Sequence, residues 1–155
     1  MANGTSFVTH RKKTIGDVAV DGLLAGMAGG LVMGVVLVLL GFLDGTGPLA
    51  TLGRFDPANG GSAAVGGLLH LAVSGIYGAF FAIGYHILSR RWPGINRYGW
   101  LLGAIFGMGL WLAAQYIFLP GLNSALADLA PSFFALGHLV YGVVIGYLMG
   151  KRPVN

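Results

Sequence analysis

Four long apolar stretches, at about residues 18–43, 64–88, 98–119 and 132–150, dominate this sequence of 155 residues. An α-helix needs about 20 apolar residues to cross the roughly 30 Å hydrocarbon core of a bilayer, and each stretch is close to that length or above it. Only 9% of the residues are charged, whereas soluble domains carry about a quarter, so the chain cannot cover a water-facing surface. Helices satisfy their own backbone hydrogen bonds in lipid. The sequence therefore predicts an all-α integral membrane bundle of four transmembrane helices.

The basic residues predict how this bundle is oriented. They occur in short clusters between the apolar stretches and not along one face, which is typical of a membrane topology signal and argues against nucleic-acid binding. Every lysine and arginine except Arg54 falls on the same side of a four-span protein. Because basic loops stay in the cytoplasm, we expect segment 1–17 and tail 151–155 there. We expect the helices, within domain 18–150, in the inner membrane of a bacterium.

Small residues recur at every fourth position within the apolar stretches. A helix with this spacing lets a neighbouring backbone come close along one ridge. In water so many glycines would weaken a helix, but in lipid the cost of unmade backbone hydrogen bonds keeps the helix intact. The predicted helix-packing positions are Gly22, Gly26, Gly30, Gly34, Ser74, Gly78, Gly99, Gly103, Gly107, Gly142 and Gly146.

The two halves of the chain share a pattern. The second and fourth stretches both contain His-x3-small-x3-Gly, which begins at His70 and at His138. The first and third stretches both carry a Leu-Leu pair with a following glycine, and both end at a turn rich in glycine and proline. We expect two parallel two-helix repeats, because two helices per half leave equivalent helices pointing the same way. The two histidines would then lie at equal depth.

His70, His138 and Gln115 form a candidate cofactor-binding layer. Both histidines are expected about two turns below the outer surface, and Gln115 near the same level. Two imidazoles from facing helices can hold haem b, and a histidine with Gln115 or Tyr116 can hydrogen-bond a quinone. In a simpler alternative, each histidine hydrogen-bonds a carbonyl, a tyrosine or Gln115 and joins two helices. Two histidines without a carboxylate make a poor metal site, so none is predicted and the cofactor stays open.

The charged residues lie near the ends of the apolar stretches. Arg90, Arg91 and Arg97 cluster at one edge beside Trp92, where they are candidates to bind anionic lipid headgroups. No carboxylate falls at mid-membrane, so a proton-coupled or sodium-coupled carrier would lack its commonest coupling group. The sequence has no cysteine and no Gly-x-Ser-x-Gly, Walker or His-Glu-x-x-His motif. We therefore expect no enzymatic activity.

Three segments resemble an uncharacterised family of small bacterial four-helix membrane proteins, catalogued as a domain of unknown function. They are Gly-Trp-Leu-Leu-Gly-Ala-Ile-Phe-Gly-Met-Gly-Leu-Trp at 99–111, Leu-Pro-Gly at 119–121 and His-Leu-Val-Tyr-Gly-Val-Val-Ile-Gly at 138–146. The likeness covers most of residues 18–150. The resemblance implies a four-span bundle with no established activity, and a place near or within respiratory assemblies is compatible with it.

Three features favour a non-catalytic accessory or scaffolding subunit: the small part of the chain that lies outside the bilayer, the glycine ridges and the lack of buried charge. Its partners would be the lipid bilayer and other membrane protein subunits, in a respiratory or other electron-transport complex. Two alternatives stay open at this point. The chain could be a redox protein that binds haem b or a quinone through His70 and His138, or a small-solute channel or carrier.

Overall fold

A computed structural model describes residues 13–151 of the chain. Its long helices are α1 (Ile15–Leu43), α3 (Ala63–Arg91), α4 (Gly99–Ala113) and α5 (Pro131–Gly150), and the described residues form no strand. Shorter elements are α2 (Pro48–Gly53), η1 (Pro93–Tyr98), the π-helical turn η2 (Ala114–Phe118), η3 (Leu119–Gly121) and η4 (Ala125–Asp128). With its short flanking helices, α4 forms one apolar segment over Pro93–Gly121, so four segments are long and apolar enough to cross a membrane. The predicted all-α class with four such segments is confirmed.

α1 begins at Ile15, earlier than the apolar stretch indicates, because a capping box starts it. The Thr14 hydroxyl accepts a hydrogen bond from the Asp17 backbone N–H at 3.2 Å, and the Asp17 carboxylate accepts one from the Thr14 N–H at 2.8 Å. This exchange satisfies backbone donors that have no partner inside the helix. Lys13 also pairs with Asp21 at 2.9 Å. The expected basic residues Arg11, Lys12 and Arg152 lie outside the described residues.

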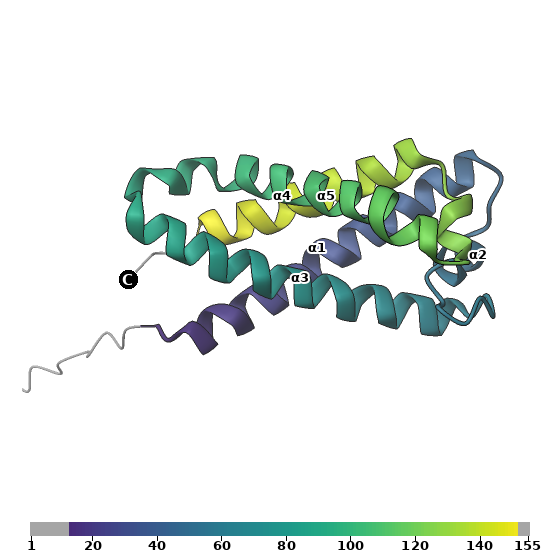
Figure 1. Ribbon diagram of the computed structural model, residues 1–155, viewed down its shortest axis with the longest axis horizontal. Helices are drawn as coiled ribbons and strands as arrows, with labels where there is room; N and C mark the ends of the chain where they lie inside the picture. The colour runs from purple at the N-terminus through teal and green to yellow at the C-terminus, as the bar shows by residue number, and fades with distance from the viewer. Residues whose placement is uncertain (1–12, 152–155) are drawn as a thin grey trace, which may run out of the picture.

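The long helices pack as two helical hairpins. Hairpin 1 consists of α1 and α3, hairpin 2 consists of α4 and α5, and the two meet mainly through α1 and α5. Figure 1 shows α2 at one end of the bundle and the turn between α3 and α4 at the other. We call these the α2 end and the basic end, since the basic end carries Arg90, Arg91, Arg97 and Lys151 as well as Lys13.

Each hairpin is held by a seam in which backbone meets backbone. In hairpin 1, a Cβ atom placed on Gly26 would overlap the Ser74 carbonyl oxygen and lie 2.8 Å from the Gly78 Cα. In hairpin 2, a Cβ on Gly103 would overlap the Gly142 carbonyl oxygen and lie 2.8 Å from the Gly146 Cα. Gly22 extends the first seam, and Gly99 and Gly107 extend the second. Two of the predicted packing glycines meet side chains instead: Gly30 meets that of Ser74, and Gly34 meets that of His70.

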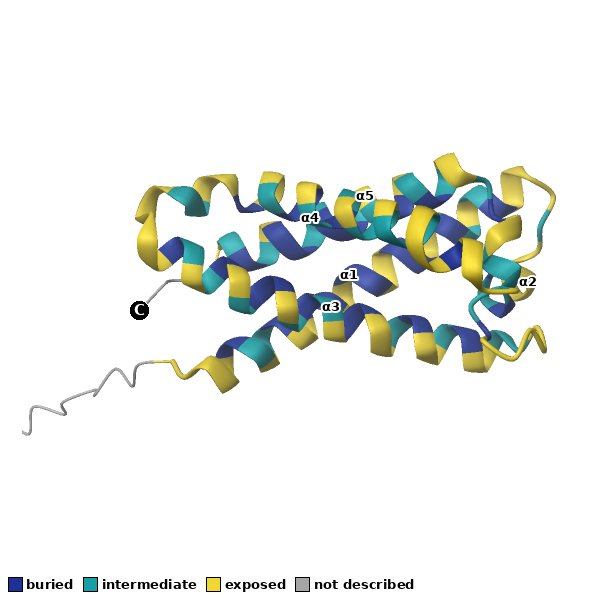
Figure 2. Cartoon of the chain, viewed as in Figure 1, coloured by how far each residue is buried: buried dark blue, intermediate teal, exposed yellow. Residues whose placement is uncertain are grey.

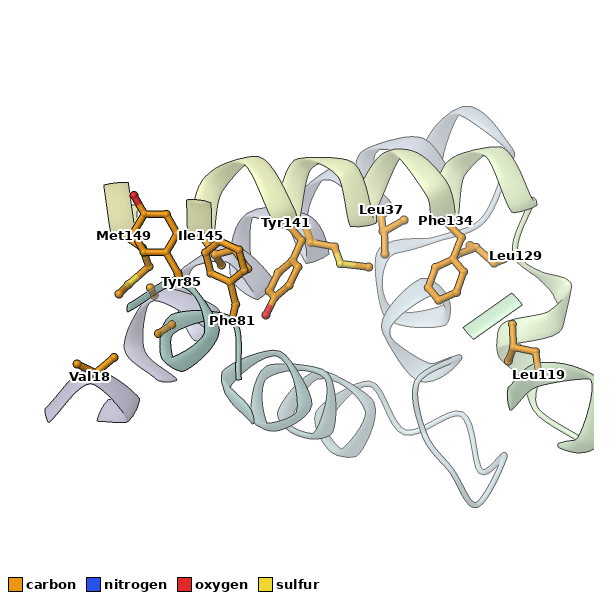
Figure 3. Close-up of a cluster of buried hydrophobic side chains, with 13 residues drawn as sticks. Val18, Leu37, Phe81, Tyr85, Leu119, Leu129, Phe134, Tyr141, Ile145 and Met149 are labelled. Atoms are coloured by element: carbon orange, nitrogen blue, oxygen red, sulfur yellow. The ribbon is translucent and has the colours of Figure 1, made fainter. Parts of the chain in front are cut away.

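The hairpins join along one side of the bundle. Gly29 of α1 faces Tyr141 and Ile145 of α5, while Gly137 of α5 faces Met33 and Leu37 of α1. Met33, Leu37, Tyr141 and Ile145 are buried at this junction, and they belong to a larger buried cluster that Figure 3 shows extending from Met149 to Leu119. By contrast, α3 and α4 make few contacts with each other. Figure 2 shows that the long helices bury their inner faces and expose the others, which carry large apolar side chains.

Candidate ligand cavity between α3 and α4

A cavity of about 210 Å³ lies where α3 and α4 separate, in the half of the bundle nearest the α2 end. Leu69 and Val73 of α3 line it and are each 39% exposed, so the cavity opens between α3 and α4 to the surface of the bundle. The wall is largely apolar with a few polar side chains, which is the composition of a small-molecule site. The lining residues are Met33, Phe55, Leu69, His70, Val73, Ser74, Tyr77, Leu110, Ala114, Leu126, Phe134, His138 and Tyr141.

The two predicted histidines line this one cavity, one from each hairpin. His70 is buried, and its ring lies against α1, where Gly30 and Gly34 leave room for it. Its Nε2 lies 2.9 Å from the Gly30 carbonyl oxygen. Because a carbonyl oxygen can only accept, Nε2 carries the hydrogen, and Nδ1 is the acceptor of the neutral ring. The Phe55 ring packs on the imidazole with 4.7 Å between centroids.

His138 has the opposite arrangement of ring nitrogens. Its Nδ1 lies 2.9 Å from the Phe134 carbonyl oxygen one turn earlier in α5, so Nδ1 donates and Nε2 is the acceptor of the neutral ring. The Phe134 ring meets the imidazole edge to face, with 4.4 Å between centroids. His138 is bonded within its own helix, whereas His70 joins α3 to α1.

Tyr141 connects the hairpins beside the histidines. Its hydroxyl donates a hydrogen bond of 2.7 Å to the Ser74 carbonyl oxygen, from α5 to α3. Tyr141 and Ser74 are both buried, and both line the cavity. Tyr77, one turn after Ser74, brings a second phenol to the wall. The cavity therefore offers two imidazoles and two phenols within an otherwise apolar lining.

Gln115 is not among the residues that line the cavity. It follows the lining residue Ala114 in the π-helical turn η2 and is half-buried. Close by in α4, the indole Nε1 of Trp111 is buried and is the one such side-chain atom of residues 13–151 without a hydrogen-bond partner. The expected layer thus contains His70 and His138, with Tyr141 and Tyr77 in place of Gln115.

The residues present do not fit haem b between the two histidines. Nε2, the nitrogen of His70 that points away from the main chain, is committed to the Gly30 carbonyl, so it cannot ligate iron as placed. Phe55 and Phe134 cover the two rings. The volume is also below the roughly 300–1,000 Å³ of sites for drug-sized ligands, which suits one substituted ring and not a macrocycle. Among residues 13–151, no three His, Asp or Glu side chains are grouped to hold a metal ion.

Two loops close the α2 end of the cavity, and the sequence did not reveal their contact. The Asn59 side chain donates to the Asn123 carbonyl oxygen at 2.6 Å and accepts from the Ala125 N–H at 3.1 Å. This clasp ties the loop before α3 to the segment before α5, and each side contributes a lining residue, Phe55 and Leu126. Asn59 has φ +53°, a conformation that asparagine tolerates better than most residues. Its position after Asp56-Pro indicates a turn, but no local pattern indicates its partner.

A second hollow lies on the other side of His70. This α1–α3 groove has a volume of about 320 Å³, and its walls are almost wholly apolar. Leu31, Val35, Leu39 and Leu68 line it and are exposed on the surface of the bundle. His70 lines both spaces, so its ring forms part of the partition between the groove and the cavity.

A comparison of the chain with protein-family models, with curated proteins and with solved structures finds no match. The geometry of the cavity is therefore the basis on which a function can be assigned.

Proposed function

We propose that the chain is a non-catalytic, multi-pass membrane subunit whose cavity binds the dihydroxy aromatic head of a quinol. One observation carries this proposal. Two histidines from different hairpins line one cavity, and each has one ring nitrogen already donating to a backbone carbonyl. The other nitrogen of each neutral ring is an acceptor, and an acceptor is what a phenolic hydroxyl of a quinol needs.

The shape of the cavity supports the same ligand. Its volume suits a single ring, and its aromatic and aliphatic wall suits the faces of that ring. The opening between α3 and α4 leads to the apolar surface of the bundle, so an isoprenoid tail can remain among the lipids. A ligand of this kind reaches the site from within the membrane.

The membrane arrangement is part of the proposal. The basic end faces the cytoplasm of a bacterial inner membrane, with both termini on that side, because arginine and lysine are retained there. The apolar α2, which is followed by the single arginine Arg54, then lies at the opposite face. The cavity belongs to the leaflet away from the cytoplasm.

The repeat of two parallel hairpins is also proposed, and the seams support it. Gly26 meets Ser74 and Gly78 in hairpin 1, as Gly103 meets Gly142 and Gly146 in hairpin 2. The same offset along the chain relates Gly22 to Gly99 and Gly30 to Gly107. A different offset, 68 residues in place of 77, relates Ser74 to Gly142 and Gly78 to Gly146. It also relates His70 to His138, although the two rings choose different carbonyls.

A role as an accessory subunit fits the surface and the core of the molecule. Large apolar side chains cover the outer faces of the spans, which leaves room for contact with other membrane subunits. In the basic half, Phe81, Ile145 and Met149 fill the space between the hairpins, so the proposal does not include a solute channel. An electron-transport complex is the setting in which a quinol site and a non-catalytic subunit belong together.

The binding test uses decyl-ubiquinol, a quinol with a short tail, titrated calorimetrically into the detergent-purified protein under anaerobic conditions. We expect His138→Leu to weaken binding about fivefold to tenfold, the value of one hydrogen bond to a neutral group. His86→Leu, in the basic half, is the matched control and leaves the affinity unchanged. Wild-type protein that binds no quinol, or a His138→Leu variant that binds as well as wild type, would contradict the site.

The subunit role has a separate test. Mild extraction from the native membrane followed by native mass spectrometry should recover the chain together with at least one other membrane subunit. A chain that is recovered only as a detergent-bound monomer would contradict the accessory role and leave the quinol titration as an independent result.

A further inference from the structure

A larger groove lies at the basic end of hairpin 1, remote from the histidine cavity. It has a volume of about 560 Å³ and is formed by the first turns of α1 and the last turns of α3. Ile15 and Val18 form one wall, and Ile83 and Ile87 form the other. At its mouth the lining changes to cationic and amphipathic residues, namely His86, Arg90, Arg91 and Trp92.

The two arginines at the mouth are available for an anion. The one ion pair that residues 13–151 contain is Lys13 with Asp21, so neither Arg90 nor Arg91 has a carboxylate partner there. The Arg91 guanidinium lies 5.8 Å from the centre of the Trp92 ring, and both arginine side chains are exposed. A guanidinium offers a planar fork of N–H donors that matches phosphate oxygens.

The nearby carboxylates do not cancel this charge. Asp17 accepts hydrogen bonds from the N–H and hydroxyl of Thr14, and Asp21 pairs with Lys13, so both serve the start of α1. No other acidic residue lies in the first turns of α1 or the last turns of α3. The groove thus combines an apolar channel with two cations at one end, which is the polarity of an anionic phospholipid.

We propose that this groove binds one anionic phospholipid, with an acyl chain between Ile83, Ile87 and Val18 and the phosphate at Arg90 and Arg91. Trp92 lies at the level where the acyl chains give way to headgroups, a position that tryptophan favours. The site excludes Arg97, which does not line the groove and instead lies over Tyr98, 4.7 Å from the ring centre. The assignment concerns the end of the bundle opposite the quinol cavity and does not depend on it.

Gly84 provides a way to fill the groove without touching its charges. It lines the groove, and a Cβ atom at this position would meet no other atom within 4 Å. Gly84→Leu therefore places a bulky apolar side chain in the channel while Arg90 and Arg91 stay in place. This variant separates a lipid, which needs the channel, from a free phosphate, which needs only the arginines.

The experiment is native mass spectrometry of the full chain in detergent, titrated with phosphatidylglycerol, with phosphatidylcholine and with inorganic phosphate. We expect the wild type to bind phosphatidylglycerol in preference. Arg90→Gln with Arg91→Gln should weaken that binding about 30-fold, from the contribution of two basic residues at an anionic surface. Arg97→Gln is the matched control and keeps wild-type affinity, whereas Gly84→Leu loses the bound lipid.

Other results would overturn the site. The double arginine variant would overturn it by binding phosphatidylglycerol as the wild type does. Arg97→Gln would overturn it by weakening binding as much as the double variant, because the arginines would then act only through general charge. Displacement of the lipid by inorganic phosphate, or full binding to Gly84→Leu, would indicate an anion site without an acyl channel. A dimer that Gly84→Leu dissociates would assign the groove to a second copy of the chain.

Discussion

At the scale of single residues, the glycines of α4 differ in what surrounds them. Gly103 lies against the backbone of α5, where a Cβ atom would overlap the Gly142 carbonyl oxygen, whereas a Cβ on Gly109 would meet nothing within 4 Å. Both occur in the same helix and in the same apolar sequence. The fourfold spacing of Gly99, Gly103 and Gly107 distinguishes the packing glycines from Gly109, which is outside that series.

Gly103→Ala should therefore destabilise the bundle by about 1–3 kcal/mol, the usual cost of forcing extra volume into a packed contact. Gly109→Ala is the matched control, and it should leave stability unchanged or raise it slightly, because alanine favours helix. The measurement is thermal unfolding of both variants in the same detergent. Equal midpoints for the two variants would contradict the seam.

The histidine pair shows what residue patterns can and cannot predict. The shared His-x3-small-x3-Gly pattern led to His70 and His138, and both line the cavity. Gln115 was included from its depth along an ideal α-helix, but a π-helical turn begins at Ala114 and changes the direction in which the following side chains point. Tyr141 was missed because its partner, the Ser74 backbone carbonyl, is distant in sequence and has no side-chain signal.

At the scale of elements, the four spans were predictable and their ends were less so. Apolar length and turn residues locate a helix, yet α1 starts at Ile15 because of the Thr14 and Asp17 side chains, which lie outside the apolar stretch. α5 begins at Pro131, a position that suits proline, since proline lacks only a hydrogen-bond donor that has no partner there. The clasp at Asn59 was not predictable, because it joins two loops that come together only when the hairpins are packed.

Asn59→Gly should loosen this clasp and leave the helices intact. Glycine keeps the positive φ of the turn but removes the two side-chain hydrogen bonds to the segment before α5. We expect faster amide exchange, measured by mass spectrometry, in the loops at 56–62 and 123–129. Asn123→Ala is the control, since Asn59 contacts only the backbone of Asn123; equal exchange in both variants would contradict the clasp.

At the scale of the whole molecule, the distribution of charge along the bundle predicts its orientation. Arg90, Arg91, Arg97 and Lys151 lie at one end with Lys13, and Arg54 follows α2 at the other. The chain has no cysteine, so a single introduced thiol can report the side of the membrane without background. Gly47 and Gly94 are suitable positions at opposite ends, because a Cβ on either would meet nothing within 4 Å.

In intact cells, a thiol reagent that cannot cross the inner membrane should label Gly47→Cys and not Gly94→Cys. After the cells are broken, both variants should be labelled. This outcome places the α2 end outside the cytoplasm, as the retention of basic residues on the cytoplasmic side requires. The reverse pattern in intact cells would contradict the proposed orientation and, with it, the leaflet assigned to the cavity.

The unequal contacts among the four helices also bear on how a ligand enters. α1 and α5 hold the two hairpins together, whereas α3 and α4 make few contacts with each other. A small rotation of one hairpin about the α1–α5 contact would widen the opening at Leu69 and Val73 while each hairpin stays rigid. The hydrogen bond from the Tyr141 hydroxyl to the Ser74 carbonyl oxygen joins hairpin 2 to hairpin 1, so such a rotation must break it.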